Sequence, residues 1–297
     1  LPDCAIDVID EVGASKKIEL SKTLKTKNEA NITIVSKDVE DVVSKMAHIP
    51  SRSATKSDLS LLKNLEKNMQ KRVFGQDKAI NSIVQAIKIN KAGLGVDKKP
   101  IGSFLFTGPT GVGKTEVAKE LALQMGIHFE RFDMSEYMEA HAVSRLIGAP
   151  AGYVGFEQGG LLTEAIRKHP HTVLLLDEIE KAHPDLMSIL LQVMDNAELT
   201  DNSGNKADFQ NVVLIMTSNL GVSEANVMGF AKNDKLNENR AINKFFAPEF
   251  RNRLDCVVSF DSLSLDIVSK VAGKFIEDLE KHLENKKIKI EISKKAK

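Results

Sequence analysis

Cysteine, aromatic residues and long apolar runs are all scarce in this sequence. Its 297 residues contain two cysteines, two tyrosines and no tryptophan. Cys4 and Cys256 lie far apart without a CxxC spacing, which excludes a disulfide scaffold and a thiolate zinc site and is typical of a reducing cytoplasm. The longest apolar run, residues 212–216, is far shorter than the roughly 18 residues that a membrane span requires. We therefore expect no membrane partner.

An excess of charge of either sign is missing as well. The chain has 41 Lys and Arg against 41 Asp and Glu, a formal net charge of zero. Domains that bind nucleic acid usually carry a marked basic excess, so we expect no nucleic-acid partner. Hydrophobic residues at 42% and charged residues at 28% are typical of a soluble globular protein. The length suggests about two domains, and because the chain begins with Leu rather than Met we expect it to be a fragment.

The spacing of apolar residues changes along the chain. Helical spacing predicts helices over residues 6–12, 62–69, 80–87 and 267–283, and a further helix led by Asp38. Short apolar or alternating runs predict strands at 32–35, 103–107, 173–176, 212–216 and 288–292. From residue 103 onward strands alternate with helical stretches, which predicts an α/β fold with a parallel sheet covered by helices on both faces.

A phosphate-binding loop follows the predicted strand at 103–107. Eight residues match the pattern GxxxxGK[ST] at every fixed position: Gly108, Pro109, Thr110, Gly111, Val112, Gly113, Lys114 and Thr115. Backbone N–H groups of such a loop surround phosphate oxygens, and the helix that follows adds a favourable dipole. Lys114 can reach the β- and γ-phosphates, and Thr115 can offer its hydroxyl to Mg²⁺. ATP and Mg²⁺ are therefore the expected cofactors.

Two carboxylates end the apolar run at 173–176. In P-loop hydrolases an Asp at this place, here Asp177, holds Mg²⁺ beside the phosphates. Glu178 is then suited to orient and deprotonate an attacking water. With the P-loop upstream, the pair predicts a nucleotide hydrolase rather than a protein that only binds nucleotide.

These motifs occur in the order seen in AAA+ ATPases. After the P-loop and Asp177-Glu178 come a polar strand end at 217–219 and the segment PEFRNRLD at 248–255. The segments RFDMSEY at 131–137 and SRLIG at 144–148 resemble the Clp/Hsp100 unfoldases in particular. The likeness covers nearly the whole chain and is closest to the second ATPase module of members that feed the ClpP peptidase. It implies an AAA+ P-loop fold, ATP hydrolysis coupled to protein unfolding, and a bacterial cytoplasmic protein.

The resemblance also implies a domain order. Residues 1–50 are similar to the end of a preceding AAA+ module, 51–57 to a linker, 58–260 to the large ATPase domain and 261–297 to the start of the small lid domain. A partial helical domain is thus expected at each end. The family's later lid motif, sensor 2, is absent from this sequence, so we expect the chain by itself to bind nucleotide weakly and hydrolyse it poorly.

Further roles follow from the resemblance, residue by residue. Asn219 matches sensor 1, which positions the lytic water, and Arg253, with Arg251 beside it, matches the arginine finger. The segment VFGQ at 73–76, which includes Val73 and Phe74, resembles the one that walls the adenine. A finger of this kind acts on the neighbouring subunit's nucleotide, which implies a homo-hexameric ring. From the residues alone, a turn-forming Asn and a salt-bridged surface Arg remain alternatives.

Two loops resemble segments through which the family contacts other proteins. The substrate-gripping pore loop corresponds to Gly152, Tyr153, Val154 and Gly155. A rigid amphipathic ring between two glycines can grip a passing chain without reading its sequence, although a tyrosine that anchors an ordinary loop would look the same. Met228, Gly229 and Phe230 match the loop that docks onto the ClpP peptidase, with a locally packed loop as the alternative. Unfolded or tagged proteins, ClpP and an adaptor are the partners that these loops imply.

Other functions stay open beside this one. A stand-alone disaggregase, a DNA-remodelling AAA+ motor and a nucleotide-gated adaptor without hydrolysis share the fold. The histidines at 169, 171 and 183 have no acidic or Cys partners at ligand spacing, so we expect no metal site other than Mg²⁺ through Thr115 and Asp177.

Overall fold

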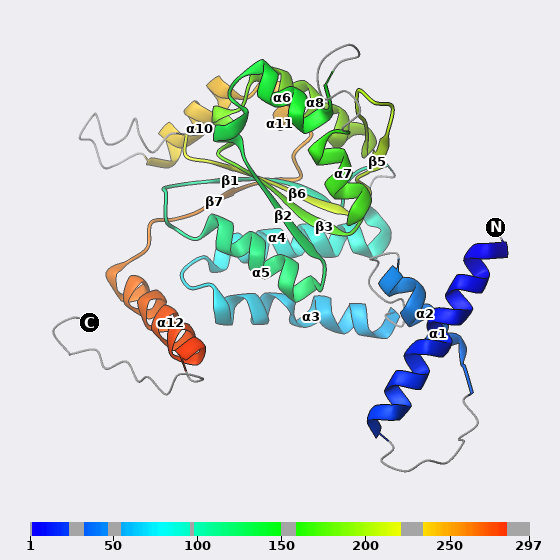
Figure 1. Cartoon of the computed structure of the whole chain (residues 1–297). Helices are drawn as coiled ribbons and strands as arrows, with labels where there is room; N and C mark the ends of the chain where they lie inside the picture. The colour runs from blue at the N-terminus through cyan, green and yellow to red at the C-terminus, as the bar shows by residue number, and fades with distance from the viewer. Residues whose placement is uncertain are drawn as a thin grey trace.

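A five-stranded parallel sheet lies between two layers of helices (Figure 1). The computed structural model describes residues 2–23, 33–46, 55–95, 98–149, 159–220 and 234–283. The strands are β1 (Gly102–Thr107), β2 (His128–Asp133), β3 (Thr172–Asp177), β6 (Val212–Ser218) and β7 (Cys256–Ser259). Their order in the sheet is β2-β3-β6-β1-β7, and each neighbouring pair is parallel. The α/β fold expected from the sequence is therefore confirmed.

The three central strands are buried along their whole length and divide the core into two halves. Phe104, Phe106 and Ile215 point to one face of the sheet, and Leu105 and Met216 point to the other. This alternation follows from the two-residue period of a strand, and burial on both faces explains why these strands read as continuous apolar runs.

Two groups of helices cover these faces (Figure 1). The lower layer contains α3 (Thr55–Arg72), α4 (Asp77–Ile89) with the π-helical turn η1 (Asn90–Leu94), and α5 (Lys114–Met125). The upper layer contains η2 (Met134–Tyr137), α6 (Ala140–Ile147), α7 (Leu161–Lys168), η3 (Ile179–Lys181), α8 (Pro184–Asn196), α10 (Asp234–Phe245) and α11 (Pro248–Arg251). A small hairpin of β4 (Glu198–Thr200) and β5 (Lys206–Asp208) follows α8. The crossover from each strand through a helix keeps the strands parallel, so their carboxyl ends share one edge of the sheet.

The remaining helices lie at the two ends of the chain. α1 (Pro2–Thr23) packs on α2 (Ser36–Met46), where Lys16 Nζ pairs with Asp38 Oδ1 at 2.8 Å. α12 (Leu265–Leu283) is fastened through Lys274, whose ammonium donates to the carbonyl of Arg72 at 3.0 Å and to Glu116 at 3.3 Å. The predicted helices are thus all found, while the domain division built on the family resemblance stays a prediction.

Local structure differs from the sequence-based predictions at several places in the chain. Residues 33–35 do not form the predicted strand, because the Val35 amide donates to Asp38 Oδ2 at 3.0 Å and this contact begins α2 instead. α3 begins at Thr55, so the last three residues of the predicted linker 51–57 are helical. The predicted strand at 288–292 lies outside the described residues. β2, β7 and the β4–β5 hairpin were not predicted, because none of these strands is completely buried and none therefore reads as an apolar run.

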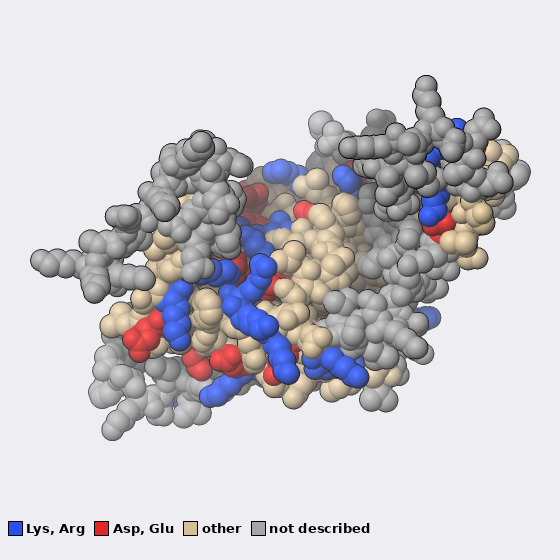
Figure 2. All heavy atoms as spheres, turned by 90° about the horizontal axis from the view of Figure 1, so that it is seen from below, with Lys and Arg blue, Asp and Glu red and all other residues tan. Residues whose placement is uncertain are grey.

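The face seen from below has mixed charge (Figure 2). Among the described residues, Lys63, Lys67 and Lys71 of α3 and Glu116 of α5 are exposed. Within the described ranges, no helix has the length and apolar character needed to cross a membrane.

Candidate nucleotide site

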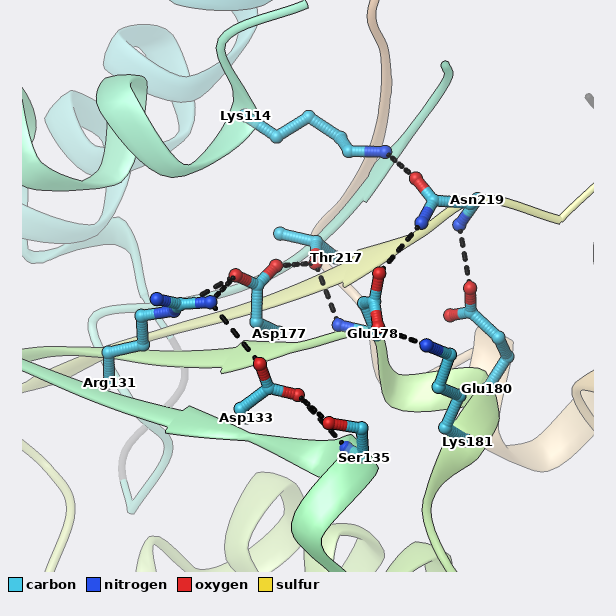
Figure 3. A network of polar contacts seen from close by, with 10 residues as sticks. All are labelled: Lys114, Arg131, Asp133, Ser135, Asp177, Glu178, Glu180, Lys181, Thr217 and Asn219. Carbon is cyan, nitrogen blue, oxygen red and sulfur yellow. Dashed lines mark hydrogen bonds and ion pairs between the residues drawn. The ribbon is translucent and has the colours of Figure 1, made fainter. Parts of the chain in front are cut away.

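The polar site lies where β1, β3 and β6 end (Figure 3). β1 leads into the P-loop, β3 ends at Asp177 and β6 ends one residue before Asn219. These are neighbouring central strands, so segments far apart in the sequence meet at one edge. The structure therefore brings together the predicted phosphate loop, the predicted Mg²⁺ carboxylate and the predicted sensor.

The glycines of the P-loop are required by its backbone. Gly108, Gly111 and Gly113 all have positive φ, and a Cβ on Gly108 would lie 2.4 Å from the carbonyl oxygen of Phe260. A Cβ on Gly111 or Gly113 would meet no other atom within 4 Å, so open space lies beside the loop. Gly113 also caps α5, whose N-terminal N–H groups face this space. A glycine-rich loop that leads into a helix N-terminus is suited to bind a phosphate group.

Lys114 reaches back across the loop. Its side chain is largely buried, and its ammonium donates to the carbonyls of Gly108 and Ser218, the latter at 3.0 Å, and to Asn219 Oδ1. A strongly hydrated ammonium is costly to bury unless oxygens surround it. Lys114 thus links the P-loop to the end of β6.

Asp177 and Thr115 form an oxygen pair suited to Mg²⁺. The hydroxyl of Thr115 donates to Asp177 Oδ2 at 3.4 Å, and the hydroxyl of Thr217 donates to Asp177 Oδ1. Mg²⁺ prefers hard oxygen ligands and usually takes few protein groups beside water and phosphate oxygens. A carboxylate and a hydroxyl next to a phosphate loop fit that ion.

Glu178 is held in a strained conformation. Its φ of 57° and ψ of 52° lie in the left-handed region, which costs a non-glycine residue about 1–3 kcal/mol and is concentrated at functional sites. Its amide donates to Thr217 Oγ1 at 3.0 Å, and its carboxylate accepts from Asn219 Nδ2 at 3.3 Å. Lys181 Nζ lies 2.6 Å from Glu178 Oε2, and this hydrogen bond raises the pKa of Lys181 above its ordinary value. Glu178 is therefore aimed at the same space as Asn219.

Asn219 is fixed from several sides. Its side chain links Lys114 and Glu178, and its amide donates to Glu180 Oε1 at 3.0 Å. Among the described residues the other oxygen, Glu180 Oε2, is buried without a hydrogen-bond partner. Asn219 thus bridges a cation and a carboxylate, and its role as sensor 1 stays a prediction.

Some residues of this network were missed by the sequence reasoning. Arg131 of β2 donates from Nε to Asp177 Oδ2 at 3.0 Å, and its Nη2 lies 3.4 Å from Asp133 Oδ2. The hydroxyl and amide of Ser135 bind Asp133, and these bonds, helped by Arg131, hold the pKa of Asp133 below its usual value despite partial burial. The polar residues that end an apolar strand were a signal for Thr217. Arg131 begins the RFDMSEY segment that resembles the family, but nothing in that segment linked Arg131 to Asp177.

The predicted adenine segment lies between α3 and α4. Val73 is buried in the lower core, and its amide donates to the carbonyl of Met69 at 2.8 Å, while Phe74 is partly exposed. Gln76, the last residue of this segment, donates from Nε2 to the carbonyls of Val112 and Asp261 at 3.2 and 2.9 Å. This segment therefore contacts the P-loop and the chain that leads to α12.

The two predicted arginines at the end of α11 are not part of the network around Lys114. Arg253 Nε pairs with Asp195 of α8 at 2.7 Å, and this hydrogen bond raises the pKa of Arg253. Arg251 contacts Asn243 of α10, and its buried Nε has no partner among the described residues. The salt-bridge alternative thus describes the contact that Arg253 makes within one chain, and its role as a finger stays a prediction.

The two predicted loops cannot be compared with the structure. The pore loop, Gly152 to Gly155, and the protease-docking loop, Met228 to Phe230, both lie outside the described residues.

Known proteins resemble this chain closely in sequence. Residues 99–257 match the AAA domain (Cdc48 subfamily). A ClpA homolog protein of Fuscovulum blasticum is 52% identical over 299 residues, covering 100% of this chain and 37% of that protein. The chaperone protein ClpB of Enterococcus faecalis is 47% identical, covering 89% and 32%. The ATP-dependent Clp protease ATP-binding subunit ClpE of Streptococcus pneumoniae is 40% identical, covering 97% and 39%. This chain spans between about a third and two fifths of these relatives.

A solved structure resembles the fold as well. A cryo-electron-microscopy reconstruction of Hsp104 with ATPγS and FITC-casein, in its closed state, superposes with a TM-score of 0.72 at 33% identity. The match covers 95% of this chain and 48% of the Hsp104 chain.

The P-loop, the acidic end of β3 and the polar end of β6 define a nucleotide-hydrolysing site on an AAA fold. The chain belongs to the Clp/Hsp100 family of AAA ATPases.

Proposed function

We propose that this chain is the ATP-hydrolysing module of a hexameric ring that unfolds proteins and threads them into a ClpP peptidase. The observation that carries the hydrolytic part is the contact between Glu178 and Asn219 beside Lys114 at one edge of the sheet. The likeness to a ClpA homolog and to a ClpE subunit supports the unfoldase part.

Each polar group has a task in ATP hydrolysis. Lys114 and the N–H groups of the P-loop bind the phosphates, and Asn219 fixes the position of the attacking water. Glu178 Oε1 accepts the 3.3 Å bond from Asn219 and retains a lone pair that can take a proton from that water. A magnesium ion held through Thr115 and Asp177 would neutralise phosphate charge.

Arg253 supplies its charge to the next subunit. It lies two residues after the end of α11 and pairs with Asp195 of α8 in the upper layer, while Lys114 and its oxygen partners lie at the end of the sheet. An arginine that completes a neighbour's site makes hydrolysis depend on assembly, and fingers of this kind raise rates by roughly 10³–10⁵.

Mixing two inactive variants tests this proposal. Arg253→Ala keeps its own site but lacks the finger, and Glu178→Gln keeps the finger but lacks the base. Each alone should lose hydrolysis by at least about a hundredfold. A mixture should regain part of the activity, because some Arg253→Ala sites then receive a finger from a Glu178→Gln neighbour.

Two outcomes would contradict the assignment. Full activity of Arg253→Ala alone would mean that its bond to Asp195 is only structural. A mixture no more active than the sum of its parts would show that the finger does not act between subunits. For the unmixed protein, hydrolysis should also rise more steeply than linearly with concentration, and a constant specific activity would argue against a ring.

A stand-alone disaggregase is the second candidate, favoured by the 47% identity to a ClpB chaperone. Binding of the ATP-loaded protein to the ClpP ring separates the two. The protease-partnered function requires binding that is lost on deletion of residues 228–230, whereas a disaggregase would not bind in either form.

A further inference from the structure

The carboxylate of Asp177 forms an ion pair with Arg131 of the neighbouring strand β2 (Figure 3). Arg131 lies on β2, where the register places Asp133 opposite Asp177 and Arg131 two residues before that pair. Its Nε and Nη2 reach the same oxygen, Asp177 Oδ2, at 3.0 and 2.8 Å. A planar guanidinium that sends two N–H groups to a carboxylate makes one of the stronger protein ion pairs.

One oxygen of Asp177, Oδ2, is approached by more hydrogen-bond donors than it has lone pairs. Oδ2 has two lone pairs, yet three donors reach it, namely the two nitrogens of Arg131 and the hydroxyl of Thr115 at 3.4 Å. Oδ1 accepts from Thr217. The crowded oxygen is the one that faces Thr115, and therefore the one on the side assigned to the metal.

Arg131 also has a second carboxylate within reach. Its Nη2 lies 3.4 Å from Asp133 Oδ2, while Ser135 binds the other oxygen, Asp133 Oδ1. The side chain of Arg131 is 45% exposed and that of Asp177 12%, so the arginine has room to shift whereas Asp177 is held in place. A guanidinium displaced from Asp177 would keep a charged partner.

We propose that Arg131 is a positioning residue that competes with the divalent cation for Asp177 and so lowers the affinity of the site for Mg²⁺. The inference rests on the proposed assignment of Thr115 and Asp177 to the metal. A univalent and a divalent cation about 5 Å apart repel each other by roughly 1.5 kcal/mol even in bulk water. That repulsion corresponds to about a tenfold weaker metal affinity.

The competition is tested by measuring the affinity for Mn²⁺ in the presence of ADP, with electron paramagnetic resonance reporting the concentration of free Mn²⁺. Arg131→Gln should bind Mn²⁺ roughly tenfold more tightly than the unmodified chain. Arg131→Lys keeps the charge and should differ by less than about threefold. Arg167→Gln removes an exposed arginine of α7 and should change nothing.

Thermal unfolding supplies a readout that separates competition from a merely structural role. Without metal, Arg131→Gln should melt at a lower temperature, because Asp177 loses its cation. Saturating Mn²⁺ should remove most of that difference. An Arg131→Gln variant with unchanged or weaker Mn²⁺ affinity would overturn the inference, and Arg131→Met serves the same comparison if the Gln variant does not fold.

The metal assignment itself is tested with Thr115→Ala. If this variant binds Mn²⁺ as tightly as the unmodified chain, the proposed metal site is wrong and the inference falls with it. If Thr115→Ala loses affinity but Arg131→Gln gains none, only the role of Arg131 is wrong.

Discussion

Two buried aspartates in this protein are surrounded in very different ways. Asp177 at the end of β3 receives a charged arginine, two hydroxyl groups and a neighbour, Glu178, with a strained backbone. Asp201, in the loop of the β4–β5 hairpin, is 5% exposed and receives neutral donors. Both sites satisfy their carboxylate, but only the site at Asp177 does so with groups that other ligands can replace.

The donors of Asp201 come from two segments, the start of α7 and the hairpin loop that contains Asp201 itself. From the start of α7, the Gly160 amide donates at 3.2 Å and the Thr163 hydroxyl at 3.0 Å. From the hairpin loop, the Ser203 amide donates at 3.0 Å, the Asn205 amide at 2.7 Å and the Asn205 side chain at 3.1 Å. Burial alone would raise the pKa of Asp201, but the hydrogen bonds from Asn205, Gly160 and Thr163 outweigh it, and the pKa lies below the usual value. The Asp201 loop therefore fastens the start of α7 to the hairpin.

We expect this contrast to separate a carboxylate that stabilises the fold, Asp201, from one that we propose serves the reaction, Asp177. Around Asp177 the hydrogen bonds are supplemented by an unpartnered oxygen, Glu180 Oε2, and by the left-handed Glu178. Such features reduce stability and persist where function selects them. We expect changes near Asp177 to alter activity most and changes at Asp201 to alter stability most.

The largest expected effect is on catalysis at the first site. Glu178→Gln should lower ATP hydrolysis by roughly 10²–10⁴-fold, because the amide cannot take a proton from water. Its free energy of unfolding should change by less than about 1 kcal/mol, since the amide preserves the shape of the side chain. Steady-state phosphate release and urea unfolding measure the two quantities. Glu164→Gln on the exposed side of α7 is the matched control and should leave hydrolysis unchanged. Near-normal hydrolysis by Glu178→Gln would show that Glu178 is not the base.

The second largest effect should be on stability at the Asp201 loop. Asp201→Ala leaves several buried donors without an acceptor and should lower the free energy of unfolding by about 3 kcal/mol. The midpoint of urea unfolding reports the change. Asp208→Ala on the same hairpin removes an exposed carboxylate that accepts one bond, from Gln210, and should cost less than about 1 kcal/mol. Equal losses for both variants would show that Asp201 has no special role.

The smallest expected effect is a pH dependence that belongs to Asp201. Because folding lowers the pKa of Asp201, its contribution to stability is present above the unfolded pKa, near 3.8, and is lost as the pH falls through the folded pKa. Unfolding midpoints measured from pH 5 downward should therefore fall less steeply in Asp201→Asn than in the unmodified chain. Parallel curves would show that the hydrogen bonds do not distinguish the charged carboxylate from a neutral group.

Sequence reasoning located most of the nucleotide site because its parts are local. A P-loop is one continuous segment whose glycines and lysine have fixed spacing, and the ends of central strands appear as apolar runs followed by polar residues. The positions of Lys114, Asp177 and Asn219 could therefore be predicted, and parallel strands then bring them together. The strand expected at 32–35 failed for a local reason as well, since Asp38 binds the Val35 amide.

Contacts between segments that are distant in sequence could not be predicted from local patterns. Gln76 joins the carbonyls of Val112 and Asp261, which lie 36 and 185 residues away. Arg131 meets Asp177 only because β2 pairs with β3 in one particular register, and a shift by one residue would turn its side chain to the other face. Gly160 and Thr163 likewise reach Asp201 across 41 and 38 residues of sequence.

The sequence by itself determined the phosphate loop, the central strands and the polar groups at their carboxyl ends, because short-range patterns encode backbone conformation and burial. Only the tertiary structure decided which charges face each other. It paired Arg131 with Asp177, Lys181 with Glu178 and Arg253 with Asp195. The physical reason is that a charge selects its partner by distance in space, and that distance is set by strand register and helix packing rather than by position along the chain.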